Sequence, residues 1–503
     1  MATDEVIPDE KLHFVVLPFM AQGHAIPLVD FAKLLAERRD VIVTLLLTPV
    51  NHIRVKPILG RSRDRGVRIL VEELAFPAEE VGLPAGCENL DLVPSNPLLA
   101  NFMAATAMLQ PQVEALLQKS ISPKPRCLVA DSVFMFAAEV ARKSGIPRIL
   151  FHPITCFTYL CSHHILTSKI LDTVSDEFEY FDVPGMPHKI SFTRSQAKGM
   201  AEIETPGWVE FNDKVIESEK AAFGLIFNTF EDMEHTYLRE YEKVRQTRIW
   251  SVGPVSLFNK EFGDKVSRGK SSTVDVDQCS KWLDAQEPGT VVYACLGSSC
   301  NLTSAQMLEL GLGLEASGRS FIWVVGFGGD DEDARKSLRE LFAQNGFEER
   351  VNKSGRGLVV FGWAPQVLIL SHPAVGGFLT HCGWNSTLEG ISAGLPAVTW
   401  PFFYDNFYNE KLLVDVLRIG VRVGVKLTVK FGKGVDSGIQ VHKDDVRDAI
   451  RELMGQGHER EARRKRAKEL AEKAKKAVEE GGSSHSNMGK IIEDVRKFNK
   501  DSC

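Results

Sequence analysis

Short apolar runs that alternate with helical segments constrain the fold of this chain more than any other feature of its sequence. Residues 13–18 form the first run, and a segment with helical spacing starts at Pro27, after a loop that contains His24. The alternation continues with apolar runs at 41–47, 67–71 and 126–130 and a long helical stretch at 97–117. Strands buried on both faces and connected by helices are typical of a parallel sheet. The first part of the chain is therefore predicted to be an α/β domain.

A polar segment divides this alternation into two blocks. Residues 254–277 are charged and rich in Gly and Ser, a composition that favours a linker between domains. Beyond it, strands are predicted at 290–295, 321–325 and 358–361, with a helix at 304–316. The chain has 503 residues, which suffices for more than one buried core. We therefore predict two α/β domains in series.

Charge and cysteine content exclude several classes of protein. The 60 Lys and Arg residues are outnumbered by 66 Asp and Glu, so the net charge is −6, without the basic excess typical of nucleic-acid binding. The N-terminal segment lacks the apolar core of a signal peptide, and no apolar run reaches the roughly 18 residues of a membrane-spanning helix. The nine Cys show neither CxxC pairs nor zinc-ligand spacing. We expect a cytoplasmic protein with reduced thiols, no metal and no integral membrane association.

Two polar residues follow predicted strands of the first domain. His24 lies just after the run at 13–18, and Asp131 follows the strand at 126–130. Ligands of open parallel sheets bind beyond the carboxyl ends of the strands, so the two side chains can meet at one edge. A neutral imidazole is suited to accept a proton near pH 7, and a carboxylate on its other nitrogen fixes the tautomer. A single loop histidine is more often structural or merely exposed, which is the alternative interpretation.

The segment from Trp363 to Asn406 holds a denser set of polar and aromatic residues. A strand is predicted at 375–380, followed by the loop HCGWNS at 381–386, which opens a helix. A small polar loop at a helix N-terminus presents unpaired N–H groups and a positive dipole end, which suits a diphosphate. Glu389, one turn inside that helix, can accept hydrogen bonds from ribose hydroxyls, and Trp363 offers a flat face to a base. For Trp363 alone, ordinary packing is the competing interpretation.

Two alternative functions remain open from these residues. The sequence Gly390-Ile-Ser-Ala-Gly394 fits the G-x-S-x-G elbow of serine hydrolases. That elbow follows a strand and precedes a helix, whereas here a helix precedes Ser392 and a predicted strand follows it. A binding protein that keeps a nucleotide cleft without catalysis is the second alternative. Such a protein would have no evident need for both His24 and Asp131.

The segment Trp363–Asn406 resembles the plant secondary-product glycosyltransferase signature, which marks UDP-dependent glycosyltransferases. WAPQ, HCGWNS and the following glutamate stand at the spacing of that signature. Similar stretches outside it, QGHAIP around His24, VADS around Asp131 and EGGSSHSN near the C-terminus, extend the resemblance over nearly the whole chain. It implies the α/β GT-B fold, in which two facing Rossmann-like domains enclose a cleft. Residues 1–253 would form an N-terminal acceptor domain, which a linker at 254–277 connects to a UDP-sugar domain at 278–484. Residues 485–503 would form a C-terminal helix that crosses back to the N-terminal domain.

The resemblance also implies a role for each site residue. His24 would deprotonate the acceptor hydroxyl, with Asp131 as its orienting partner. The uracil of the donor would be held by Trp363, Ala364 and Gln366, and the ribose by Glu389. The diphosphate would be held by Ser298, His381, Asn385 and Ser386. The sugar would be held by Trp384, Asp405 and Asn406. The implied reaction inverts the anomeric carbon without a metal or another cofactor, because the helix end and its donors stabilise the leaving UDP.

The resemblance fixes the donor and the acceptor less closely. Asn406 stands where glucosyltransferases usually carry Gln, and its amide is one methylene shorter, while Tyr404 replaces a commoner small residue. UDP-glucose is the predicted donor, and the alternatives are galactose, xylose, arabinose or rhamnose as the sugar, or extension of an existing glycoside. The stretch VPGMPHKISFTRSQ from Val183 resembles the branch that acts on flavonoids, triterpenoids and steroids. We expect a monomer whose partners are these small molecules and not nucleic acid.

Overall fold

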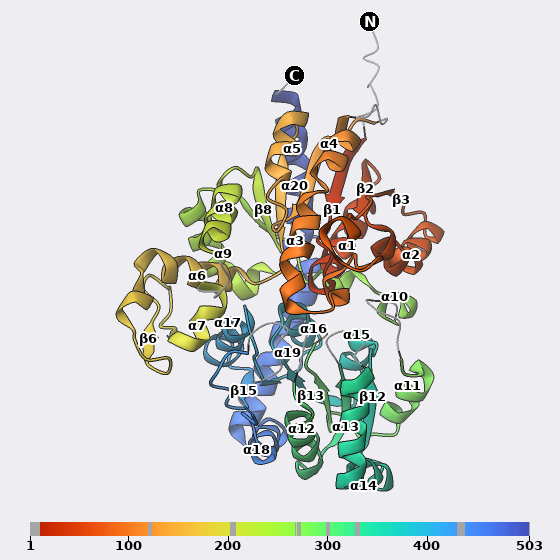
Figure 1. Ribbon diagram of the computed structural model, residues 1–503, viewed down its shortest axis with the longest axis vertical. Helices are drawn as coiled ribbons and strands as arrows, with labels where there is room; N and C mark the ends of the chain where they lie inside the picture. The colour runs from red at the N-terminus through yellow and green to blue at the C-terminus, as the bar shows by residue number, and fades with distance from the viewer. Residues whose placement is uncertain are drawn as a thin grey trace, which may run out of the picture.

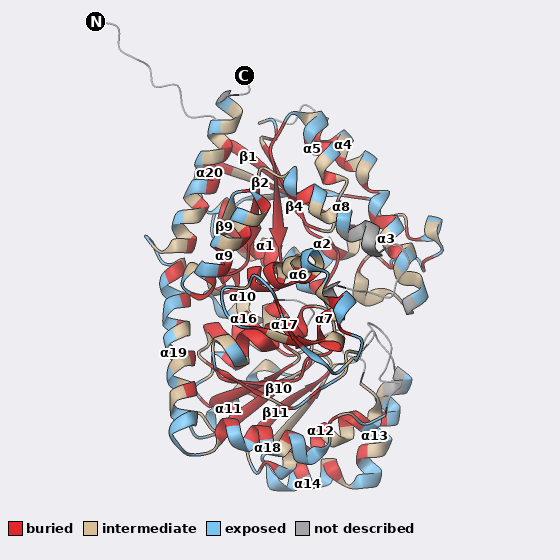
Figure 2. Cartoon of the chain, turned by 90° about the vertical axis from the view of Figure 1, so that its left-hand side faces the viewer, coloured by how far each residue is buried: buried red, intermediate tan, exposed pale blue. Residues whose placement is uncertain are grey.

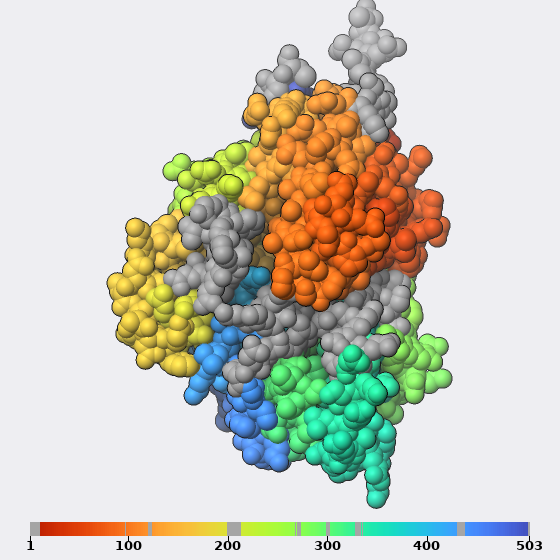
Figure 3. All heavy atoms as spheres, in the orientation of Figure 1, coloured from red at the N-terminus to blue at the C-terminus, as the bar shows by residue number. Residues whose placement is uncertain are grey.

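Two parallel β-sheets with surrounding helices organise the chain (Figure 1). The computed structural model describes residues 11–118, 123–201, 208–266, 268, 273–297, 302–326, 332–429 and 438–501. In the space-filling view, the N-terminal part of the chain forms the upper lobe, and most of the part beyond the first sheet forms the lower lobe (Figure 3). This architecture confirms the predicted α/β class.

The first sheet has the strand order β3-β2-β1-β4-β5-β8-β9, and all its neighbouring strands are parallel. The strands are β1 (Leu12–Leu17), β2 (Val41–Leu47), β3 (Ile69–Glu73), β4 (Cys127–Asp131), β5 (Arg148–His152), β8 (Gly224–Phe227) and β9 (Ile249–Ser251). Phe14 and Val16 of β1 belong to one hydrophobic cluster, and Val15 and Leu17 belong to another. Both faces of the sheet are therefore buried, which explains why its central strands are continuous apolar runs.

The second sheet has the order β12-β11-β10-β13-β14-β15, again with parallel neighbours. Its strands are β10 (Val291–Cys295), β11 (Ser320–Val325), β12 (Gly357–Phe361), β13 (Val375–Thr380), β14 (Ala397–Thr399) and β15 (Gly420–Arg422). A small antiparallel ribbon is formed by β6 (Tyr180–Asp182) and β7 (Ser191–Thr193). Figure 2 shows the strands of the second sheet as largely buried, like those of the first.

Helices connect the strands and complete both lobes. Those from the first sheet to the start of the second are α1 (Gln22–Ala36), α2 (Pro49–Asp64), α3 (Leu99–Ala107), α4 (Gln110–Gln118), α5 (Ala137–Ser144), α6 (Cys156–Ser168), α7 (Arg194–Ala201), α8 (Trp208–Lys220), α9 (Glu231–Arg245), α10 (Phe262–Val266) and α11 (Val276–Asp284). The remaining ones are α12 (Ser304–Ala316), α13 (Glu332–Asn345), α14 (Phe347–Ser354), α15 (Gln366–Leu370), α16 (Trp384–Ser392), α17 (Asn406–Lys411), α18 (Lys443–Met454), α19 (His458–Val478) and α20 (Ser483–Asp501).

The strand order reverses near the middle of each sheet. β1 lies between β2 and β4, and β10 lies between β11 and β13. At such a point the connections leave in opposite directions and open a crevice beyond the carboxyl ends of the strands. His24 follows β1 and Asp131 ends β4, while Gly297 follows β10 and His381 follows β13. The topology thus brings His24 and Asp131 to the edge of the first sheet, and Gly297 and His381 to the facing edge of the second sheet.

Three predicted elements differ from the structure in position. Helix α1 begins at Gln22, so His24 lies in its first turn and not in a preceding loop. The strand predicted at 67–71 is β3, shifted by two residues. The stretch predicted as one helix at 97–117 is divided between α3 and α4. Pro111 stands at the start of α4, and a continuous helix would lose the bond that its missing N–H would make.

The described part of the segment predicted as a linker contains structure of its own. It includes a 3-10 turn, Val255–Phe258, and helix α10. Asp264 of α10 is 1% exposed. Its carboxylate accepts hydrogen bonds from Arg61 and Arg65, each at 2.8 Å, and from Lys33 at 3.5 Å. Charged residues of this segment therefore form ion pairs with α1 and the region of α2, and do not only contact solvent.

The C-terminal helices run along one side of both lobes (Figure 2). Helix α19 contacts α16 of the lower lobe and α9 of the upper lobe. Helix α20 packs on β9, and its Met488, Ile491 and Val495 belong to the same hydrophobic cluster as the strands of the first sheet. Within the described residues, no helix combines the length and apolar character that crossing a membrane requires.

Candidate active site

A cleft of about 450 Å³ lies between the two sheet edges. Its wall includes residues from α1, from the segment between the domains, and from the loops and helices that follow β12, β13 and β14. The predicted site residues that line it are His24, Trp363, Ala364, Gln366, His381, Trp384, Asn385, Ser386, Glu389, Asp405 and Asn406. Asp131 lies behind His24, and Ser298 falls outside the residues that the structure describes.

His24 and Asp131 form a hydrogen-bonded pair on the upper side of the cleft. The distance from His24 Nδ1 to Asp131 Oδ2 is 2.9 Å, and the aspartate side chain is fully buried. The other oxygen, Oδ1, accepts the backbone N–H of Val133 at 3.1 Å, so the carboxylate is held from two sides. Because Nδ1 donates its proton to Asp131, the tautomer that fits this geometry leaves the Nε2 lone pair available to accept a proton.

The electrostatic surroundings favour a more basic imidazole. Burial alone would lower the pKa of His24, but the charge and hydrogen bond of Asp131 outweigh it, with a further contribution from the charge of Asp405. The net result is a pKa above the ordinary value of histidine. An imidazole of this kind stabilises the proton that it receives, which is what a general base requires.

The lower side of the cleft is built around the loop between β13 and α16. Gly297 has φ +81°, and a Cβ atom there would lie only 2.6 Å from the His381 ring. Glycine is thus required for the end of β10 to approach this ring. Burial lowers the pKa of His381 to about 4, so the side chain is neutral, and its Nδ1 is buried without a hydrogen-bond partner among the residues that the structure describes. A neutral imidazole beside a helix N-terminus can donate one hydrogen bond to an anion such as a phosphate.

Glu389 of α16 is buried but faces the cleft with both oxygens engaged. Oε2 accepts from Gln366 Nε2 at 2.8 Å, and the same nitrogen lies 3.0 Å from Ser386 Oγ. Oε1 pairs with Arg268, whose Nε also donates to Asp30 of α1 at 2.9 Å. Arg268 lies in the predicted linker and was missed from the sequence, where nothing distinguishes it from other charged residues nearby.

Asp405 and Asn406 occupy the start of α17. Burial raises the pKa of Asp405 to about 6, although hydrogen bonds from Asn409 and Asn406 oppose the rise. Asn409 Nδ2 donates to Asp405 Oδ2 at 2.7 Å. The Asn406 amide is used locally, because its oxygen accepts from the backbone of Phe402 and Phe403, each at 3.4 Å, and its nitrogen donates to Asp405 at 3.3 Å. These bonds hold the shorter amide close to its own backbone.

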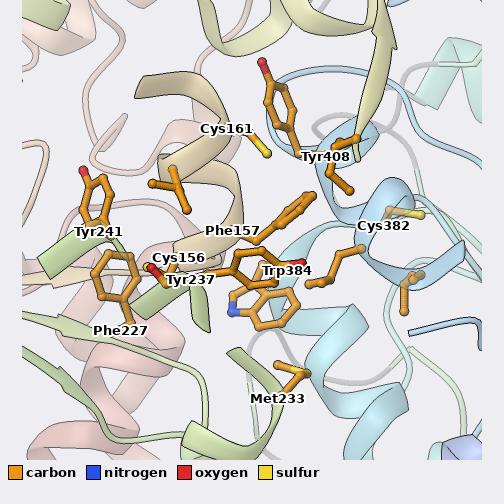
Figure 4. Close-up of a cluster of buried hydrophobic side chains, with 14 of the residues drawn as sticks. Cys156, Phe157, Cys161, Phe227, Met233, Tyr237, Tyr241, Cys382, Trp384 and Tyr408 are labelled. Atoms are coloured by element: carbon orange, nitrogen blue, oxygen red, sulfur yellow. The ribbon is translucent and has the colours of Figure 1, made fainter. Parts of the chain in front are cut away.

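Trp384 and Asn385 connect the lower lobe to the upper one. The Trp384 indole is 2% exposed and donates its N–H to the Asn228 carbonyl at 2.8 Å. Its ring belongs to a hydrophobic cluster with Phe157 and Tyr237 of the upper lobe, as Figure 4 shows. Asn385 Nδ2 donates to the backbone carbonyl of Gly23. Asn228 was also missed, because its contacts depend on how the two lobes pack.

The serine of the G-x-S-x-G sequence does not face the cleft as a nucleophile. Ser392 is 4% exposed, lies at the end of α16, and donates its hydroxyl to the Leu388 carbonyl at 2.7 Å. A nucleophile elbow instead exposes its serine at a turn from strand to helix. The hydrolase alternative is therefore wrong.

Comparisons with known proteins show which family this chain resembles. The family model described as UDP-glucoronosyl and UDP-glucosyl transferase matches residues 270–430. The chain is 47% identical to UDP-glycosyltransferase 73C6 of Arabidopsis thaliana over 489 residues, 97% of each protein. It is 48% identical to UDP-glycosyltransferase 73C25 of Barbarea vulgaris over 491 residues, again 97% of each.

Solved structures show the same similarity in three dimensions. The crystal structure of UGT73P12 from Glycyrrhiza uralensis, complexed with glycyrrhetinic acid 3-O-monoglucuronide, matches with a TM-score of 0.89 at 35% identity. The match covers 97% of this chain and 96% of that one. With a full-length resemblance in sequence and in fold, this chain belongs to the plant UDP-glycosyltransferases of the GT-B fold.

Proposed function

We propose that this UDP-glycosyltransferase moves glucose from UDP-glucose to a hydroxyl of a small lipophilic metabolite, such as a flavonoid, triterpenoid or steroid. The observation that carries the proposal is that the His24–Asp131 pair and the loop before α16 face one cleft. A base and a nucleotide site in the same cleft are what direct transfer between two bound substrates needs. The enzyme is further proposed to act as a cytoplasmic monomer.

In the proposed mechanism, the upper lobe activates the acceptor. His24 Nε2 takes the proton of the acceptor hydroxyl as its oxygen attacks the anomeric carbon, and the bond from that carbon to the UDP oxygen breaks. Asp131 holds the imidazole through Nδ1 and stabilises the imidazolium that forms. Attack from the face opposite the leaving group inverts the anomeric carbon, so an α-linked donor gives a β-glycoside.

The lower lobe binds the donor and stabilises the leaving group. Trp363 is proposed to stack on uracil beside Ala364 and Gln366, and Glu389 to accept the ribose hydroxyls. The charge that develops on UDP would be met by the N-terminus of α16 together with His381, Asn385, Ser386 and Ser298. Trp384, Asp405 and Asn406 are proposed to lie at the sugar. The Trp384 indole N–H is already bonded to Asn228, so its backbone is the part that remains for the sugar.

The identity of the donor sugar depends on Asn406 and Tyr404. The Asn406 side chain is tied to its own loop and to Asp405, so it extends less far toward a sugar than Gln would. UDP-glucose is the first proposal because Asp405 keeps an ionisable carboxylate on the wall of the cleft. A smaller amide also leaves more space, which favours the alternative that another UDP-sugar is used.

The nature of the acceptor is supported by one relative and by the cleft wall. Pro153 and Ile154, which follow β5, line the cleft on the same lobe as His24. Apolar groups beside a base suit a lipophilic alcohol or phenol. The UGT73P12 structure contains a triterpenoid monoglucuronide. Triterpenoids, including ones that already carry a sugar, are therefore the acceptors to test first.

A donor panel tests the proposed function. The purified protein would be incubated with UDP-glucose, UDP-galactose, UDP-xylose, UDP-arabinose, UDP-glucuronate and UDP-rhamnose, each with mixed flavonoid and triterpenoid acceptors, and products would be read by mass spectrometry. We expect transfer from UDP-glucose. Transfer from another donor alone would mean that Asn406 and Tyr404 reshape the sugar site, and the glucose proposal would fall.

A further inference from the structure

Helix α1 contains a proline where an α-helix ordinarily needs a donor. Pro27 lies inside α1, five residues after the helix begins at Gln22. In an α-helix, the N–H of each residue donates to the carbonyl four residues earlier, and proline has no N–H. Residue 27 therefore cannot supply the bond that the carbonyl of Gly23 would receive from any other residue type.

The carbonyl of Gly23 instead accepts a hydrogen bond from the opposite lobe. Asn385 Nδ2, in the first turn of α16, donates to it. The Asn385 oxygen lies 3.5 Å from Asn228 Nδ2, which places a donor on its other side. The side-chain amide of Asn385 is thus held between the Gly23 carbonyl and the Asn228 side chain, which both belong to the upper lobe. A bond that helix α1 gives up is replaced by one that joins the two lobes.

The position of this bond connects the two halves of the proposed reaction. Gly23 precedes His24, and Asn385 belongs to the loop proposed to bind the diphosphate. We infer that Pro27 is a positioning residue, which leaves the Gly23 carbonyl to Asn385 and so holds His24 in register with the donor bound below it. This inference rests on the proposed role of His24 as the base.

A second proline in a helix offers a comparison within the same lobe. Pro57 lies inside α2, where the residue four positions earlier is Ile53, which is 70% exposed. Pro57 is itself exposed and does not line the cleft. Both prolines cost their helices a hydrogen bond. Of these two prolines, Pro27 is the one for which the described residues include a bond from the other lobe to the freed carbonyl.

The test replaces Pro27 with alanine. In Pro27→Ala the new N–H can donate to Gly23 within the helix, in competition with Asn385. We expect an equal or higher Tm, because alanine favours the helix, together with a kcat lower by about fivefold, the size of one hydrogen bond. The KM for the UDP-sugar and the Kd for UDP should change by less than about twofold, since the donor contacts remain. Pro57→Ala is the matched control and should raise Tm without changing kcat.

A double-mutant cycle separates positioning from a structural effect. In an Asn385→Ala background, the bond to Gly23 is already lost, so adding Pro27→Ala should lower kcat no further. Additive losses of kcat, or an unchanged kcat in Pro27→Ala, would overturn the inference. His24→Ala is measured in parallel. If it keeps full turnover, the proposed base is wrong; if it is inactive while Pro27→Ala behaves like the wild type, only the role of Pro27 fails.

Discussion

The two sides of the cleft each present a histidine, and their surroundings shift the two imidazoles in opposite directions. His24 on the upper side has a buried carboxylate on Nδ1, and its pKa is raised despite burial. His381 on the lower side pairs with no charged group in the described part of the chain, and burial lowers its pKa to about 4. The comparison shows that a nearby carboxylate, and not burial, decides which histidine can take up a proton.

The same contrast suits the two histidines to different functions. A base must bind a proton during the reaction, and His24 is arranged to stabilise its protonated form. A group that binds a diphosphate can act as a neutral hydrogen-bond donor, because the charge at that site is supplied by the N-terminus of α16. His24 is therefore expected to govern turnover, and His381 is expected to govern the affinity for UDP.

The largest expected effect comes from removing the upper histidine. In His24→Ala, transfer to a weakly acidic alcohol should fall by about a thousandfold, since Asp131 is fully buried behind the removed ring and does not line the cleft. The Kd for UDP, measured by calorimetry, should stay within about twofold of the wild type because the proposed nucleotide contacts lie on the other lobe. His381→Ala is the matched comparison and should weaken UDP binding. A His24→Ala enzyme that retains most of its turnover would contradict the contrast between the two sides.

Removing the carboxylate behind His24 should have the next largest effect. In Asp131→Asn, kcat should fall by about a hundredfold, because the amide neither stabilises the imidazolium nor fixes the tautomer as well. Asp131 raises the pKa of His24, so its loss lowers that pKa. The rate rises as His24 loses its proton, and the acidic limb of kcat/KM should therefore move to lower pH. An unmoved limb would mean that another group controls the profile.

The lower side of the cleft was the more predictable from the sequence. Trp363, His381, Glu389 and Asp405 lie within one continuous stretch of the chain, from the end of β12 to the start of α17, so their spacing along the chain already restricts their spacing in space. The His24–Asp131 pair spans 107 positions, yet it was predictable because β1 and β4 could be recognised and parallel strands end at a common edge. Both cases rest on local patterns that the sheet topology then brings together.

Contacts across the two lobes could not be predicted in this way. The bonds from Trp384 to Asn228, from Asn385 to Gly23 and from Arg268 to Glu389 all depend on the orientation of one lobe against the other. Hydrophobic periodicity describes each helix and strand but not that orientation. In the described part of the predicted linker, Asp264 is buried and accepts hydrogen bonds from cations that are distant in the sequence. A polar composition cannot distinguish such an ion pair from exposure to solvent.

A smaller effect is expected from the carboxylate proposed to lie at the sugar. Asp405 can accept hydrogen bonds from sugar hydroxyls when it is ionised, and burial raises its pKa to about 6. The affinity for the UDP-sugar should therefore weaken as pH falls through about 6. Asp405→Asn should raise the KM for the UDP-sugar about tenfold and remove this dependence on pH. Equal losses of affinity for UDP and UDP-sugar would place Asp405 away from the sugar.

The smallest expected effect, of opposite sign, concerns Arg268. Its guanidinium pairs with Glu389 Oε1, one of the two oxygens proposed to accept the ribose hydroxyls, and also with Asp30 of the upper lobe. A ribose must compete with Arg268 for that oxygen, so Arg268→Ala should lower the KM for the UDP-sugar by about threefold with kcat unchanged. Arg268→Lys retains a cation, so its KM for the UDP-sugar should lie between those of the wild type and Arg268→Ala. A raised KM in Arg268→Ala would show instead that the guanidinium binds the donor, and the segment between the lobes would then belong to the nucleotide site.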